Sequence, residues 1–129
     1  MIEKFAYKKE TNKPFNDVVE AIEKNTVDNQ FRLLHTHNVQ ATLEEKGFEI
    51  KPLKIMEICN AGFANKALGI DLNVALFMPC KFVVAQHDNN VSVTLMKPTM
   101  IADFIEQDDL RNLADEVELK LIKIMEDSI

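Results

Sequence analysis

Apolar residues along the chain follow two periods, one typical of strands and the other of helices. Short apolar or alternating runs, bounded by polar and turn residues, predict strands at 2–7, 31–37, 53–59, 81–87 and 91–97, and a further apolar run at 74–78 stops at Pro79. Apolar residues three and four apart predict helices beginning near residues 15, 38, 60 and 108, with a helical turn at 100–104. This order predicts an α+β fold: a single compact domain over residues 1–129, with a mixed β-sheet and helices packed on it.

Polar residues and glycines mark where several of these elements begin and end. Asn38 and Asn60 each precede a helical pattern and are typical N-cap residues, while Gly47 and Gly69 suit the ends of the two helices. The segment 88–90 (DNN) separates the two clearest strands and predicts a hairpin.

The C-terminal helix is predicted to be amphipathic. Its main apolar stripe is Leu110, Leu113, Val117, Leu121 and Ile124. Leu119 and Ile122 lie beside that stripe and widen the apolar face. A face of this width would suit a contact in a homodimer or deeper burial within one chain.

Charge is unevenly spread along the 129 residues, which carry a formal net charge of −6. Residues 1–54 are balanced, so the excess of acid lies in residues 55–129, with Arg111 as the only base between Asp103 and Glu118. Such a surface repels phosphate backbones, and we therefore expect no nucleic-acid partner. A solvated helix face is the ordinary explanation of the acidic run.

Other functional classes are excluded by what the sequence lacks. The three glycines are too scattered for a phosphate-binding loop, and neither serine lies in a nucleophile motif. No apolar run is long enough to span a membrane, and the N-terminal residues do not resemble a signal peptide. With only two cysteines, the chain is expected to be cytoplasmic, with free thiols.

The two cysteines are nevertheless the main candidates for chemistry. Cys59 is expected at a strand end and Asn60 at the start of the next helix, where the helix dipole would lower the pKa of a thiol. The alternative is that Cys59 is a small buried apolar residue. Cys80 follows Pro79 at the start of a strand, and only the fold can show whether the two thiols face one pocket.

His35 and His37 are candidate metal ligands, because residues two apart on a strand point to the same face. Together with Cys59 and Cys80 they could form a zinc site with two histidines and two cysteines, although no characteristic spacing supports it. Isolated histidines are the ordinary alternative. Several methionines, among them Met78, could suggest soft-metal binding, but methionine is also a common core residue.

Several short motifs resemble those of one family, domain of unknown function 302. They are residues 39–48 (VQATLEEKGF), 58–60 (ICN), 67–68 (AL), Asp71 and 78–80 (MPC). The similarity covers about residues 5–98; it departs at Ala61, where the family often has proline, and at Phe77, where an aliphatic residue is usual. It implies a compact, homodimeric bacterial or archaeal domain without an established activity. The family's two cysteines fall on Cys59 and Cys80.

The sequence thus leads to one hypothesis with two rivals. The hypothesis is a small cytoplasmic homodimer that binds a small ligand or a metal at Cys59, Asn60 and Cys80, with His35 or His37 as optional metal ligands. The first rival is a thiol enzyme in which Cys59 attacks and Cys80 resolves. The second is a structural or interaction module with both cysteines in its core.

Overall fold

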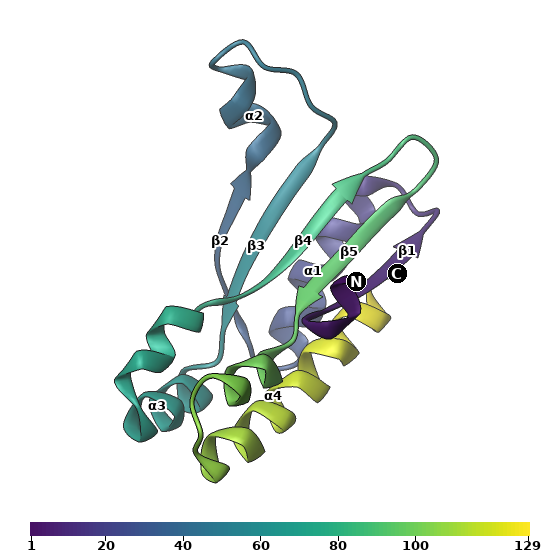
Figure 1. Ribbon diagram of the computed structural model, residues 1–129. Helices are drawn as coiled ribbons and strands as arrows, with labels where there is room; N and C mark the ends of the chain where they lie inside the picture. The colour runs from purple at the N-terminus through teal and green to yellow at the C-terminus, as the bar shows by residue number, and fades with distance from the viewer.

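The computed structural model describes all 129 residues, and its centre is one five-stranded sheet in the order β1-β5-β4-β3-β2 (Figure 1). The strands are β1 (Ala6–Thr11), β2 (Arg32–Asn38), β3 (Leu53–Cys59), β4 (Cys80–Gln86) and β5 (Val91–Met96). The predicted α+β class is confirmed, but every neighbouring pair is antiparallel, so the prediction of a mixed sheet was wrong.

The antiparallel topology follows from the segments that join the strands. The apolar run at 74–78 is not a strand but part of a short 3₁₀ helix, η2 (Leu72–Phe77), which returns the chain so that β4 runs antiparallel beside β3. A second deviation lies at the N-terminus, where residues 2–4 form the 3₁₀ turn η1 (Ile2–Lys4) and the first strand begins only at Ala6.

The four α-helices match the predicted segments: α1 (Phe15–Asp28), α2 (Val39–Glu44), α3 (Ala61–Ile70) and α4 (Asp108–Asp127). The Ala41 N–H donates to Asn38 Oδ1 over 3.0 Å, as expected of an N-cap. Gly47 follows α2 with a φ of 85°, a conformation that glycine adopts without strain. Gly69, in contrast, lies within α3, which continues to Ile70.

The main core lies between the sheet and the two long helices, which cover the same face of the sheet (Figure 1). Val18 and Ile22 of α1 and Leu121 and Ile124 of α4 are fully buried there against the strands. The two residues beside the α4 stripe differ: Ile122 packs against this core, whereas Leu119 is 70% exposed.

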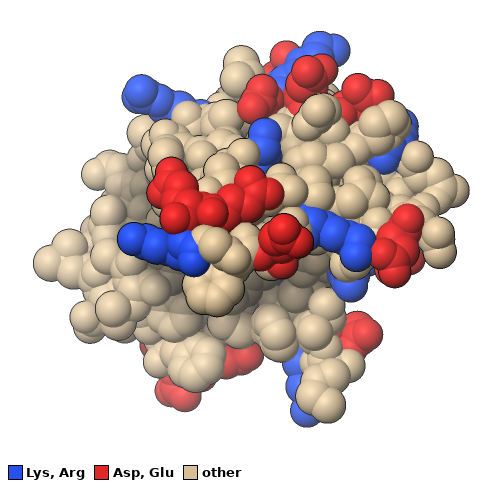
Figure 2. Space-filling view, turned by 90° about the horizontal axis from the view of Figure 1, so that it is seen from above, with Lys and Arg blue, Asp and Glu red and all other residues tan.

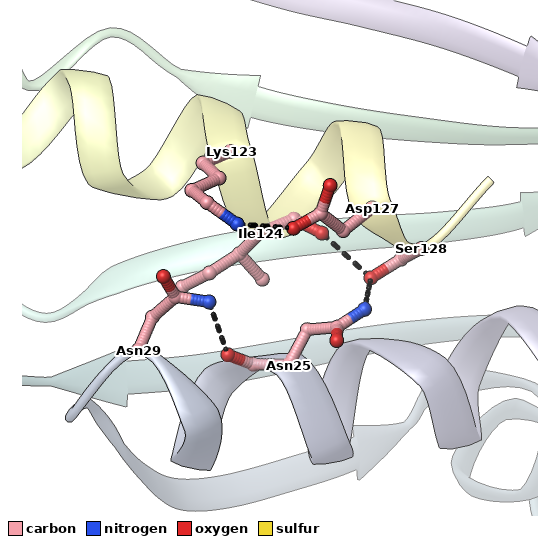
Figure 3. Close-up of polar contacts among 6 residues, drawn as sticks. All are labelled: Asn25, Asn29, Lys123, Ile124, Asp127 and Ser128. Carbon is pink, nitrogen blue, oxygen red and sulfur yellow. Dashed lines mark hydrogen bonds and ion pairs between the residues drawn. The ribbon is translucent and has the colours of Figure 1, made fainter.

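A hydrogen bond connects the C-terminal end of α4 to α1 (Figure 3). The buried Ser128 hydroxyl donates to the Ile124 carbonyl over 2.6 Å and accepts from Asn25 Nδ2 over 2.9 Å. Asn29 Nδ2 in turn donates to the Asn25 carbonyl over 2.8 Å. One hydrogen bond, from Asn25 Nδ2 to the Ser128 hydroxyl, therefore joins the two helices in addition to the apolar packing.

A smaller apolar cluster lies beyond one end of the sheet. It joins Val74 of η2, Ile101 of the 3₁₀ helix η3 (Pro98–Asp103), and Leu110 and Ala114 of α4. The elements α3, η2, η3 and the first half of α4 thus surround the ends of β3 and β4 (Figure 1).

The surface carries charges of both signs. On the face seen from above in Figure 2, acidic and basic side chains are interspersed, and no continuous basic area is visible on it. None of the helices has the length and apolar character needed to cross a membrane.

Candidate functional site

An apolar cavity lies between the main core and the smaller cluster. Its volume is about 100 Å³, it is partly open to solvent, and 15 of its 18 lining residues are hydrophobic. The three others are Asn60, Pro79 and Pro98, so Asn60 carries the only side-chain amide in the wall. The predicted site residues Cys59, Asn60 and Cys80 all line this one cavity.

Asn60, in the wall of the cavity, links the start of α3 to the backbone at Gln30. Its Oδ1 accepts from the Phe63 N–H over 3.0 Å and caps α3, as the sequence predicted. Its Nδ2 donates to the Gln30 carbonyl over 2.9 Å, and Gln30 has a φ of 66°, an uncommon value for a residue with a side chain. The amide is therefore engaged with the backbone on both sides.

Both thiols line the cavity where β3 ends at Cys59 and β4 begins at Cys80. Cys80 lies opposite Ile58 in the β3–β4 pair, so Cys59 is one position beyond the residue that faces it. Burial, together with the nearby Cys59, raises the pKa of the Cys80 thiol to about 11. Burial also raises the pKa of Cys59.

The expected lowering of the Cys59 pKa was therefore wrong. The prediction was based on the position of Cys59 before α3 alone. In the structure Cys59 is also part of an apolar wall, where burial disfavours the charged thiolate and raises the pKa. In addition, the Phe63 N–H at the start of α3 is already engaged by Asn60. Both thiols are held in their neutral form, which does not favour nucleophilic attack by Cys59.

His35 and His37 share one face, as predicted, with ring centroids 4.2 Å apart, but they lie outside the cavity. His35 is opposite Glu57 and His37 opposite Ile55, whereas Cys59 pairs with Arg32 at the other end of β2. His37 Nε2 instead contacts Glu57 Oε1 at 2.6 Å.

The zinc site with two histidines and two cysteines was therefore a wrong prediction. No three histidine, cysteine or acidic side chains gather closely enough to hold a metal ion. Spacing on one strand correctly placed the histidines on a common face, but it carried no information on their distance from the cysteines. Of the methionines, Met78 is the one that lines the cavity.

Most of the cavity wall was not predicted as part of a site. Phe63 and Ala67 come from α3, Phe77 from η2, and Leu110 and Leu113 from α4. In the sequence these residues belong to the apolar stripe of each helix, and the stripe predicted only that they are part of the core. A stripe does not reveal whether the opposing side chains fill the space between two elements.

Comparison with known proteins assigns the family. A crystal structure described as that of the uncharacterized conserved protein DUF302 from Bacillus stearothermophilus has a TM-score of 0.91 and 28% sequence identity, and the match covers 97% of this chain and 98% of that one. No curated protein matches the sequence. Residues 7–128 match the family described as domain of unknown function DUF302, so the chain belongs to the DUF302 family.

Proposed function

We propose that the protein binds a small, largely apolar molecule in the cavity beside Cys59, Asn60 and Cys80. The observation that carries this proposal is the lining: a partly open cavity of about 100 Å³ with 15 hydrophobic residues among 18. Clefts with mostly apolar walls and few polar groups are the usual form of small-molecule sites. An engineered apolar cavity of about 150 Å³ stays dry and binds benzene, so a ring or a short aliphatic chain is the body that suits this one.

The state of the polar groups supports an apolar ligand. The Asn60 amide is occupied by Gln30 and Phe63, and both thiols are neutral at physiological pH. Recognition then relies on shape and dispersion, with the thiols as small polarizable parts of the wall. The raised thiol pKa values weigh against the rival thiol enzyme, because the thiolate is the nucleophile.

The proposal can be tested with tryptophol, a neutral indole alcohol. The chain contains no tryptophan, so indole fluorescence reports on the ligand alone. We expect a saturable blue shift with a Kd of about 0.1–1 mM, the range for a ligand of this size at ordinary efficiency. A fluorescence signal that stays linear up to the solubility limit would overturn the proposal.

Two alanine variants on one helix locate the bound probe. Ala67 lines the cavity, and Ala67→Leu places three more carbon atoms in it without lowering helix propensity. Ala61→Leu makes the same change at an exposed position of α3 outside the cavity. We expect the Kd for tryptophol to rise at least about tenfold in Ala67→Leu and to stay unchanged in Ala61→Leu. Equal effects of the two changes would place the probe elsewhere.

The homodimer stays a prediction. Leu119, one of the two residues that suggested it, is 70% exposed on α4 and therefore available for a contact. Sedimentation equilibrium should give twice the chain mass of 14.7 kDa, and Leu119→Glu should shift the population toward monomer. A monomeric unaltered chain at about 100 μM would contradict the prediction.

A further inference from the structure

Aromatic rings and sulfur atoms are concentrated in the wall of the cavity. Three of the chain's eight phenylalanines are among the 18 lining residues. Both cysteines and one of the six methionines line the cavity as well. These side chains are Phe31, Phe63, Phe77, Cys59, Cys80 and Met78. The remaining hydrophobic residues of the wall are aliphatic, so the wall combines aliphatic groups with polarizable ones.

The rings and sulfur atoms come from both of the apolar clusters that enclose the cavity. Phe31 belongs to the main core, and Phe63 and Cys80 pack against it. Phe77 and Met78 pack against the smaller cluster. Each of the two clusters therefore contributes at least one ring and one sulfur atom to the wall of the cavity between them.

Contacts with other aromatic side chains hold the rings of the wall in place. The ring centroids of Phe31 and Phe63 are 6.2 Å apart, with 30° between their planes. The ring of Phe77 lies 5.8 Å from that of Phe104, with 33° between the planes, and Phe104 does not line the cavity. Aromatic pairs in proteins favour centroid separations of about 4.5–7 Å. The three rings are therefore already positioned in the chain without a ligand.

Such a wall distinguishes an aromatic ligand from a saturated one. Aromatic rings attract one another through their quadrupoles, and sulfur makes favourable contacts with ring edges, in both cases beyond the effect of burial. A saturated ring or an alkyl chain in the same space gains only from the removal of its apolar surface from water and from ordinary dispersion.

We propose that the cavity selects ligands with an aromatic ring over saturated ligands of the same carbon number. This inference rests on the proposed function and replaces its general apolar molecule with an aromatic one. The Asn60 amide is already engaged and both thiols are neutral, so the chemical class that fits is a neutral arene with at most a small polar substituent.

Three alcohols with the same number of carbon atoms test the inference: 2-phenylethanol, its saturated counterpart 2-cyclohexylethanol, and 1-octanol, which has a thin flexible chain. Each Kd is measured by displacement of tryptophol and compared with the free energy of transfer of that alcohol from water to cyclohexane. In a wall that acts only as an apolar solvent, the Kd values would follow these transfer free energies. We expect 2-phenylethanol to bind about three- to tenfold more tightly than this relation predicts from the two saturated alcohols.

Leucine substitutions locate this excess affinity. Phe63→Leu and Phe77→Leu each remove one ring from the wall and retain an apolar side chain. Each change should reduce the excess affinity for 2-phenylethanol, and the two together should bring it below about twofold. Phe15→Leu is the control, because Phe15 packs against the main core and does not line the cavity, so the excess should stay unchanged. Far-UV circular dichroism identifies the folded variants, and the single substitutions serve as the test if the double variant does not fold.

The outcomes separate the two proposals. If tryptophol does not bind, the proposed function fails and the inference fails with it. If tryptophol binds and the three alcohols follow their transfer free energies, only the inference is overturned. It is also overturned if 1-octanol shows the same excess affinity as 2-phenylethanol, because the thickness of the ligand would then decide its binding. The same holds if Phe15→Leu reduces the excess as much as the substitutions in the wall do.

Discussion

Replacing Asn60 by alanine should destabilise the protein measurably, because this side chain makes two contacts that nothing else in the site replaces. Its Oδ1 accepts the Phe63 N–H over 3.0 Å, and its Nδ2 donates to the Gln30 carbonyl over 2.9 Å. Loss of an N-cap costs about 1 kcal/mol, and loss of a largely exposed hydrogen bond adds about 0.5 kcal/mol. The free energy of unfolding should therefore fall by about 1.5 kcal/mol.

Urea unfolding followed by far-UV circular dichroism measures this loss. The midpoint should fall with an unchanged slope, and thermal unfolding should shift by about 3–6 °C for a chain of this size. Asn60→Ser retains a side-chain oxygen for capping and loses the donor to Gln30, so its stability should lie between those of Asn60→Ala and the unaltered chain. Asn38→Ala is the matched control, since Asn38 caps α2 through one comparable 3.0 Å bond and has no contact like that with Gln30. The reasoning would be refuted if Asn60→Ser were as destabilised as Asn60→Ala. It would also be refuted if the stability of Asn60→Ala differed by less than about 0.3 kcal/mol from that of the unaltered chain.

Three further predictions concern the thiols, the helix contact and the cavity. With a pKa of about 11, about one Cys80 side chain in three thousand is a thiolate at pH 7.5. Iodoacetamide should therefore modify Cys80 more slowly than Cys59. Both cysteines should react more slowly than glutathione until urea unfolds the chain. The Cys80 thiol has a pKa near 9 in the unfolded chain, so it loses its proton there at a lower pH than in the folded chain. The free energy of unfolding should therefore decline between pH 9 and 11, and this decline should be smaller in Cys80→Ala. A free energy of unfolding that does not change over this pH range would contradict the raised pKa. Ser128→Ala should lower stability by about 1–2 kcal/mol in urea unfolding, whereas Asp127→Asn, which breaks only an exposed ion pair with Lys123, should change it by less than about 0.5 kcal/mol. Ala67→Leu should raise the unfolding midpoint, and a loss above about 2 kcal/mol would show that the space beside Ala67 is already filled.

Local chemistry explains why much of the fold was predictable. The run LKIMEIC has the bounds of β3, Asn60 caps the helix that follows, and the DNN turn joins β4 to β5. Each of these features is decided within a few residues, by hydrophobic period or by a side chain that satisfies a backbone donor close by. The junction of a strand and a helix at Cys59 and Asn60 was predictable for the same reason, and the structure places a cavity there.

The predictions that were wrong concern properties that depend on residues distant in the sequence. The antiparallel pairing of β3 with β4 depends on the connection that contains η2. The apolar run of η2 resembled a strand because a short 3₁₀ segment has no distinctive period. The direction of the thiol pKa shifts rests on a wall built from α3, η2, η3 and α4, which no local motif describes. The predicted zinc site was wrong because of the strand register: in the β2–β3 pair, Arg32 and not a histidine lies opposite Cys59.

The cavity is open because small side chains line it at helix positions where larger side chains would also allow the helix to form. Ala64 and Ala67 contribute from α3 and Ala114 from α4, while the neighbouring main core contains side chains with no exposed surface at all. Leucine has nearly the helix propensity of alanine, so secondary structure does not require alanine at these positions. An apolar ligand of the proposed kind would cover this wall beside the two thiols and, by binding only the folded chain, would stabilise it.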